Sequence, residues 1–170
     1  NCGWSSMQAQ IEHGAGAHAD IELACFGVGG VTLAVDVAQV REVARCPVVT
    51  PLPKAPSLIE GVIDLRGRVI PVVDLGRALL DAPCVSDPLA RVVVLELDGL
   101  VFGLRVGSEA DVLTLRAAAL EEPPALATHA GYDAIRAVVR RAGDSPVLVI
   151  SVEHLLERIY RSARNQEDAA

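Results

Sequence analysis

The chain has 170 residues, a length that suits one domain or two small halves around a common core. It carries 22 acidic and 15 basic side chains, and the net charge of −7 argues against nucleic acid as its main partner. Half of the residues are hydrophobic but only 3% are aromatic, so Val, Leu, Ile and Ala must fill the core. This composition favours many short strands with small inward side chains.

The numbers of arginine and cysteine residues indicate which kinds of binding or metal site the chain could contain. Fourteen of the 15 basic side chains are arginine. Genome composition explains this bias, or else the chain uses the forked guanidinium to contact carboxylates of a protein partner. The four cysteines include no CxxC pair and no histidine at ligand spacing, so no metal, cofactor or disulfide scaffold is predicted. Reduced thiols in a cytoplasmic protein are expected.

The two ends of the chain read as tails. Residues 1–19 are polar and rich in Gly and Ala, which predicts a flexible segment, and residues 1–6 precede the only methionine, as a cloning remnant would. A polar tail is also expected at 161–170. No apolar run approaches 18 residues and no charged start leads into an apolar stretch, so neither membrane insertion nor secretion is predicted.

Between the tails, pairs of apolar runs joined by turn-forming residues predict four β-hairpins. The first two pairs are 20–28 with 31–36, and 58–65 with 69–75 around Arg66-Gly67-Arg68. The other two are 91–97 with 100–106, and 134–141 with 146–151. The strand-like runs REVARCPVV and ADVLTL follow the first and third hairpins, and each precedes a Pro-rich loop.

The order of these features repeats, which indicates a duplication. Each half ends on a hairpin and a helix, and IEGVI at 59–63 matches IRAVV at 135–139 with an offset of 76 residues. Asp74 and Ser151 occupy matching positions, and both suit the N-cap of the helix that follows. The last helix is predicted from Val152 to about Arg161. The alternative is that any two apolar hairpins look alike; duplication instead predicts a pair of small barrels with about five strands each.

No set of residues predicts an enzyme. Asp74-Leu75-Gly76 after an apolar strand invites comparison with aspartic proteases, whose two carboxylates share a proton. Leu75 lacks the hydroxyl that such a site needs, and Ser151 at the matching position lacks the carboxylate, so a helix cap is the better interpretation. The sequence also contains no HExxH, G-x-S-x-G, P-loop or G-x-G-x-x-G motif.

Two charged residues stand out among apolar neighbours. Glu42 lies in the strand-like run Val40–Ala44, and Arg66 opens the tight turn after Ile63-Asp64-Leu65. From the residues alone, Glu42 is either a solvated strand charge or part of a recognition surface. Arg66 is likewise either a plain turn residue or a recognition residue.

A resemblance to a known family bears on this choice. The stretch TPLPKAPSLIEGVIDLRGRVIPVVDLGRALL resembles the signature of CheW-type coupling proteins, G-V-x-N-L-R-G-x-x-x-P-x-x-D-L. The runs VTLAVDVAQVREV, LVFGLRVGSEADVLTL and AIRAVVRRAGDSPVLVISVEHLL resemble further strands of that family, and the likeness covers about residues 20–160. It implies a mainly β fold of two intertwined five-stranded SH3-like barrels, with short helices and a C-terminal helix.

The resemblance also implies a function and a site. Proteins of this type are non-catalytic adaptors that bridge the cytoplasmic tip of a chemoreceptor to the regulatory domain of a CheA-type histidine kinase. By position, Val40 falls in the family's receptor-binding groove between the barrels, and Glu42 and Arg66 fall on positions that face each other. Gly61 and Gly67 match glycines that permit close backbone approach. These five residues are the predicted partner-binding site.

Four positions depart from the family pattern. Asp64 stands where the family usually has Asn, and Ala137 replaces the glycine of the second-half match. Gly107 replaces an acidic residue, and Arg105 adds a charge just before it. These departures leave open a role in a pathway outside chemotaxis, such as surface motility or development, or a kinase regulatory domain expressed alone. A barrel that holds a small ligand is the remaining alternative.

Overall fold

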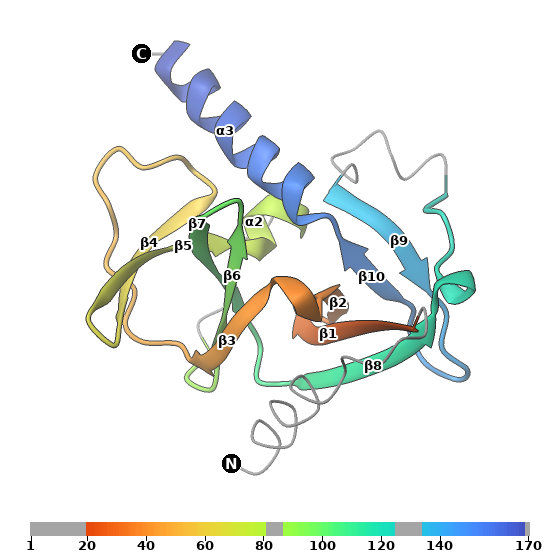
Figure 1. Cartoon of the computed structure of the whole chain (residues 1–170). Coiled ribbons are helices and arrows are strands. Elements are labelled where there is room, and N and C mark those ends of the chain that lie inside the picture. Colours follow the sequence, from red (N-terminus) through yellow and green to blue (C-terminus); the bar gives the residue numbers. More distant parts are fainter. Residues whose placement is uncertain (1–19, 81–86, 125–133, 169–170) are drawn as a thin grey trace.

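The structure is a computed structural model that describes residues 20–80, 87–124 and 134–168. Within these ranges the chain forms ten strands in two five-stranded sheets, with two α-helices packed against them (Figure 1). The tail predicted at 1–19 lies outside the described residues. The mainly β fold with short helices and a C-terminal helix is confirmed.

Each sheet curls into a small barrel, here called barrel A and barrel B. Barrel A contains β1 (Asp20–Val28), β2 (Val31–Asp36), β8 (Ala110–Arg116), β9 (Ile135–Val139) and β10 (Val147–Ile150). Barrel B contains β3 (Val40–Arg45), β4 (Ile59–Leu65), β5 (Arg68–Asp74), β6 (Arg91–Leu97) and β7 (Leu100–Val106). The helices are α2 (Leu75–Leu80) and α3 (Val152–Asp168), with short 3-10 turns η1 (Val37–Gln39) and η2 (Ala117–Ala119). All four predicted hairpins are present.

The two halves of the chain exchange hairpins. The strand order is β8-β1-β2-β10-β9 in one sheet and β3-β6-β7-β5-β4 in the other. Each half therefore inserts its first hairpin between strands of the other half. The intertwined arrangement of two barrels implied by the resemblance is confirmed. The sequence pattern does not predict this exchange. All the hairpins have a similar apolar alternation, and such alternation does not specify which strands pair.

The two barrels share several details that a duplication predicts. A parallel pair joins β2 to β10 and another joins β5 to β7. A register shift interrupts β4 between Ile59 and Gly61, and a corresponding shift interrupts β9 between Ile135 and Ala137. Single bridges close both barrels: Thr50 pairs with Val62, and Glu121 pairs with Val138. The residues Val62 and Val138 differ by the same 76 positions as the sequence match.

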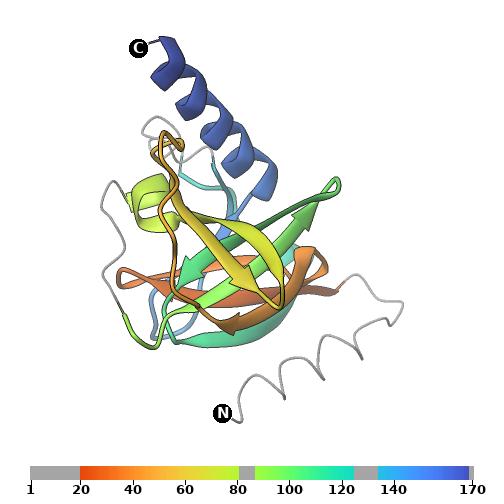
Figure 2. The same cartoon turned by 90° about the vertical axis from the view of Figure 1, so that its left-hand side faces the viewer.

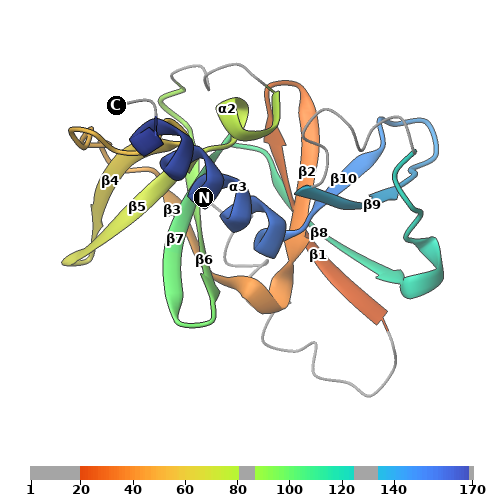
Figure 3. The same ribbon diagram turned by 90° about the horizontal axis from the view of Figure 1, so that it is seen from above.

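Three clusters of side chains fill the interior. One fills barrel B and consists of Ile63, Ile70, Val72, Val92 and Val94. A second fills barrel A and consists of Leu23, Cys25, Ala34, Ala137, Val139, Val147 and Val149. The largest lies between the barrels and includes both phenylalanines, Phe26 and Phe102. Helix α3 covers this shared core with Val152, Leu155 and Ile159, and Figure 3 shows it crossing above the seam between the sheets.

Both helix caps form as predicted. The Asp74 carboxylate accepts a hydrogen bond from the Arg77 backbone N–H at 3.1 Å, and the Ser151 hydroxyl accepts one from His154 N–H at 3.4 Å. Helix α3 is longer than predicted, because it continues to Asp168. Its last turns extend away from the barrels (Figure 2) and bury little, so no apolar stripe marked them in the sequence.

Candidate partner-binding site

The β4–β5 turn presents Arg66 on a constrained backbone. Arg66 and Gly67 have φ angles of +55° and +79°, the pattern of a type I′ hairpin turn. Asp64 Oδ1 accepts a hydrogen bond from the Gly67 N–H at 2.9 Å, which fixes the turn from within. Because an amide oxygen at position 64 would accept the same bond, the replacement of Asn by Asp64 leaves the turn intact.

Glu42 and Arg66 face each other across the seam of barrel B. Arg66 Nη1 lies 3.5 Å from Glu42 Oε2, although the residues are 24 positions apart in the chain. The Arg66 side chain is 79% exposed and that of Glu42 is 25% exposed. The second oxygen, Glu42 Oε1, is buried and has no hydrogen-bond partner among the described residues. The predicted pairing of these two residues therefore holds in geometry.

The two predicted glycines are required for different reasons. A Cβ on Gly61 would lie 2.2 Å from the Thr50 carbonyl oxygen, so glycine there allows the close backbone approach that was predicted. A Cβ on Gly67 would meet nothing within 4 Å. The interpretation of Gly67 as a close-approach glycine is wrong: its role is to adopt a positive φ in the turn.

Val40 lies two residues before Glu42 on the same strand. It is half-buried at the junction of η1 and β3, and it packs against the core shared by both barrels. Val40, Glu42, Arg66 and Gly67 thus belong to the β3 edge and the neighbouring turn. Gly61 lies toward the opposite end of β4 and acts on the fold of that strand.

The other departures from the family pattern are accommodated locally. The Arg105 guanidinium forms an ion pair with Glu60, and both side chains are mostly buried. Gly107 donates its N–H to the Gly27 carbonyl at 2.7 Å, and a Cβ on Gly107 would lie only 2.8 Å from that oxygen. Ala137 is buried in the barrel A core. The second half is therefore packed around the residues that differ from the family.

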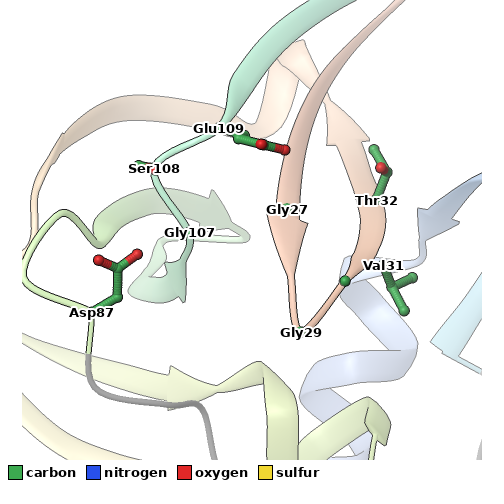
Figure 4. A pocket seen from close by; sticks show the side chains of 9 residues that line it. Gly27, Gly29, Val31, Thr32, Asp87, Gly107, Ser108 and Glu109 are labelled. Carbon is green, nitrogen blue, oxygen red and sulfur yellow. The ribbon is translucent and has the colours of Figure 1, made fainter.

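A cavity of about 330 Å³ lies away from all five predicted site residues. Its lining comes from the β1–β2 turn, Asp87 and the β7–β8 connection, and the side chains there include those of Asp87 and Glu109 (Figure 4). Asp87 Oδ1 accepts the Leu89 N–H at 2.8 Å, so this carboxylate stabilises a turn. No local sequence pattern predicts this cavity, because three separate connections form it.

The titratable groups in the described ranges were compared with the requirements of a metal site and with their ordinary pKa values. No group of three or more His, Cys, Asp or Glu residues there could hold a metal ion. Burial raises the pKa of the Cys25 thiol to about 11, with the Asp111 carboxylate adding to the rise and Arg141 opposing it. Burial also raises the pKa of the Cys46 thiol. Both thiols therefore favour the protonated form, which is the less reactive one.

At the closing bridge of barrel A, the side chains of Arg140 and Glu121 are hydrogen-bonded to each other. Arg140 Nε donates to Glu121 Oε2 at 2.7 Å, and the hydrogen bond lowers the pKa of the Glu121 carboxyl. Both side chains are solvent-accessible, so this pair adds little to stability. Across the described ranges, no helix is both long and apolar enough to span a bilayer.

Comparison with known proteins agrees with the fold. The family model described as the CheW-like domain matches residues 22–160. The chain belongs to this family. It is 36% identical to Protein FrzA of Myxococcus xanthus over 151 residues, which cover 86% of this chain and 92% of that protein. It is 33% identical to a probable chemotaxis protein CheW of Rhizobium etli over 111 residues, covering 64% and 70% of the two chains.

A solved structure of a CheW-like protein shows the same fold. The scaffolding protein TtCheW from Thermoanaerobacter tengcongensis matches with a TM-score of 0.72, covering 84% of this chain and 92% of that one. Its sequence is 24% identical, so this match concerns the fold alone. It agrees with the two barrels and the C-terminal helix described above.

Proposed function

We propose that this CheW-like protein is a non-catalytic cytoplasmic adaptor. In this proposal it couples the cytoplasmic tip of a chemoreceptor to the regulatory domain of a CheA-type histidine kinase. The observation that carries the proposal is the Arg66 turn. An arginine that is 79% exposed adds little to the fold, yet it is held on a left-handed backbone beside Glu42. The same residue occupies the arginine of the family signature.

Arg66 is suited to recognise a receptor helix. Its guanidinium offers a planar fork of donors, and the contact with Glu42 limits the orientations that the fork can adopt. Val40, two residues before Glu42 on β3, adds a half-buried apolar contact. The guanidinium of Arg66 and the apolar side chain of Val40 match the usual composition of an interface, where arginine often contributes much of the binding energy.

Exposed apolar side chains near the closing bridge and beside the β4–β5 turn of barrel B support docking of a kinase regulatory domain. Val48 is 88% exposed, Val69 is 70% exposed and Leu52 is 45% exposed. Val48 and Leu52 flank Thr50, which pairs with Val62 on β4. We expect an interface of about 1,000–1,600 Å² in total, with weak salt dependence and a negative heat-capacity change.

A second candidate pathway follows from the similarity to FrzA. That relative bears a name other than CheW and matches this chain over more of its length than the Rhizobium etli protein does. The same adaptor chemistry would then serve a kinase and receptor outside chemotaxis, in surface motility or development. Gene neighbourhood and a pull-down that identifies the bound kinase would separate the two pathways. A small-ligand barrel is less well supported, because the described side chains fill both barrel interiors.

The experiment that tests the proposal pairs a thermal melt with a titration of the receptor-tip fragment. Arg66→Ala should leave the melting temperature nearly unchanged, because an exposed ion pair contributes about 0–1 kcal/mol to folding. It should weaken binding of the receptor tip by about 2 kcal/mol. If Arg66→Ala unfolds the protein, then Arg66 is a structural residue.

The double charge reversal is the matched control. Glu42→Arg combined with Arg66→Glu should keep the attraction between the two side chains and preserve the fold. It should not restore receptor binding, because the partner still requires a cation at position 66. An affinity that returns to the wild-type value would mean that the pair matters only to the fold. Unchanged binding by Arg66→Ala would remove the role proposed for this turn.

A further inference from the structure

Two arginines lie directly opposite each other on neighbouring strands of barrel B. In the antiparallel register of β3 and β6, Arg45 pairs with Arg91. Side chains two residues apart along a strand share a face, so both arginines share the face of Val43 and Val93. Those valines belong to the core between the barrels. The two guanidiniums therefore lie at one end of that core.

Neither arginine has an acidic partner within the described ranges. The ion pairs found there include neither Arg45 nor Arg91, and the Arg91 Nε is buried with no hydrogen-bond acceptor. Arg45 is exposed and Arg91 is half-buried. The same two strands contain a neutralised arginine for comparison, because Arg41 forms an ion pair with Glu96.

Such a pair is unfavourable in the free protein. Like charges at directly opposed positions of a sheet repel each other, and a buried donor without an acceptor loses its hydrogen bond to water. A carboxylate placed between the two guanidiniums would relieve both problems, since it accepts from two forked donors at once.

We infer that Arg45 and Arg91 form a receiving site for a glutamate or aspartate side chain of a protein partner. This inference rests on the proposed adaptor function, because the carboxylate belongs to a protein that the adaptor binds. Glu42 and Arg45 are three residues apart on β3, about 10 Å along the strand, so their side chains lie on opposite faces. The Arg45–Arg91 site is therefore distinct from the surface formed by Glu42 and the Arg66 turn.

A protein carboxylate fits the site better than a phosphate backbone. The chain has a net charge of −7, which repels polyanions, and only two unpaired cations meet at this point. Val43 and Val93 adjoin the arginines on the side of the shared core. A single carboxylate side chain matches two guanidiniums that meet at one point.

The first test observes the arginine Nε–H signals by NMR in the whole chain. The probe is a terminally blocked Gly-Glu-Gly peptide, with Gly-Gln-Gly and inorganic phosphate as controls. The signals of Arg45 and Arg91 should shift and saturate with the glutamate peptide, while the Arg41 signal stays in place. Equal shifts with the glutamine peptide would overturn the inference. A saturating response to phosphate alone would also overturn it.

The second test separates recognition from a structural role. Arg91→Glu replaces repulsion with attraction, so it should raise the melting temperature by about 1–3 °C. The same variant should weaken receptor-tip or kinase-domain binding at least tenfold. Arg45→Glu, at the exposed position, should act in the same way and serves if Arg91→Glu does not fold. Arg41→Gln is the matched control and should leave binding within about twofold.

The outcomes distinguish this inference from the adaptor proposal. If the wild type binds neither partner fragment, the adaptor function fails, whereas the peptide titration still tests the carboxylate site. If the wild type binds and both charge reversals bind equally well, the carboxylate site is wrong and the adaptor function stands. A lower melting temperature for both reversals would show that the arginines support the fold.

Discussion

Among single residues, Arg66 is unusual, because it combines a long side chain with the left-handed backbone of the β4–β5 turn in barrel B. Glycine is the residue that adopts positive φ without steric cost, and Gly67 uses this freedom. Arg66 adopts φ +55° with a full side chain, a conformation that only a few per cent of non-glycine residues have. A glycine at position 66 would suit the backbone equally well. The arginine therefore points to a function of its side chain.

The first prediction concerns the effect of a substitution at Gly61 on stability. Gly61→Ala should destabilise the protein by about 2 kcal/mol or more, because its Cβ would collide with the Thr50 carbonyl at the bridge that closes barrel B. Gly99→Ala is the control, since Gly99 has φ +80° but open space around it. It should cost about 1 kcal/mol from backbone strain alone. Urea denaturation of both variants compares the two costs, and equal losses would contradict the steric account.

Cys25 gives a prediction about alkaline pH. The pKa of its thiol is about 11 in the folded protein, compared with an ordinary value of 9.0. The unfolded chain loses this proton first, so the free energy of unfolding is intact below pH 9 and falls as pH rises from 9 to 11. The slope should approach about 1.4 kcal/mol per pH unit. Urea melts from pH 8 to 11 should show a steeper fall in the wild type than in Cys25→Ala, in which the buried Cys46 thiol still contributes. Parallel curves for the two proteins would refute this prediction.

At the scale of elements, local patterns predicted the hairpins and the helix caps because turn and cap residues act within a few positions. Asp98-Gly99 and Gly29-Gly30 mark their turns without help from the rest of the fold. The end of α3 was missed because residues 161–168 carry no apolar stripe, although many of them favour helix. The pairing of Glu42 with Arg66 came from the family resemblance. The Arg45–Arg91 pair depends on the register of β3 and β6, which the sequence does not specify.

The cap of α2 gives the element-scale prediction. Asp74 is 4% exposed and caps α2 through the Arg77 N–H, so Asp74→Ala should cost about 2 kcal/mol. Asp74→Asn should cost only about 0.5–1 kcal/mol, since asparagine also caps well. Ser151→Ala at the matching cap of α3 is the comparison and should cost about 1 kcal/mol. If Asn proves as costly as Ala, the carboxylate charge near Arg77 matters more than the cap.

At the scale of the whole molecule, the exchanged hairpins make the two barrels one cooperative unit. Each sheet needs strands from both halves, and the shared core receives side chains from both sheets and from α3. Such a unit offers two barrel surfaces in a fixed relation, which suits a protein that must hold two partners at once. The Arg66 turn, the exposed apolar positions near Thr50 and the unpaired Arg45 and Arg91 all lie on barrel B.

A three-component sedimentation experiment tests whether this chain joins a receptor to a kinase. The receptor-tip fragment, the kinase regulatory domain and the chain are mixed in all combinations in an analytical ultracentrifuge. We predict one complex containing all three proteins and a smaller amount of it with Arg66→Ala. No joint sedimentation of receptor and kinase is expected when the chain is left out. If binding of the receptor displaces the kinase, or if the chain joins only one of them, the adaptor account is contradicted.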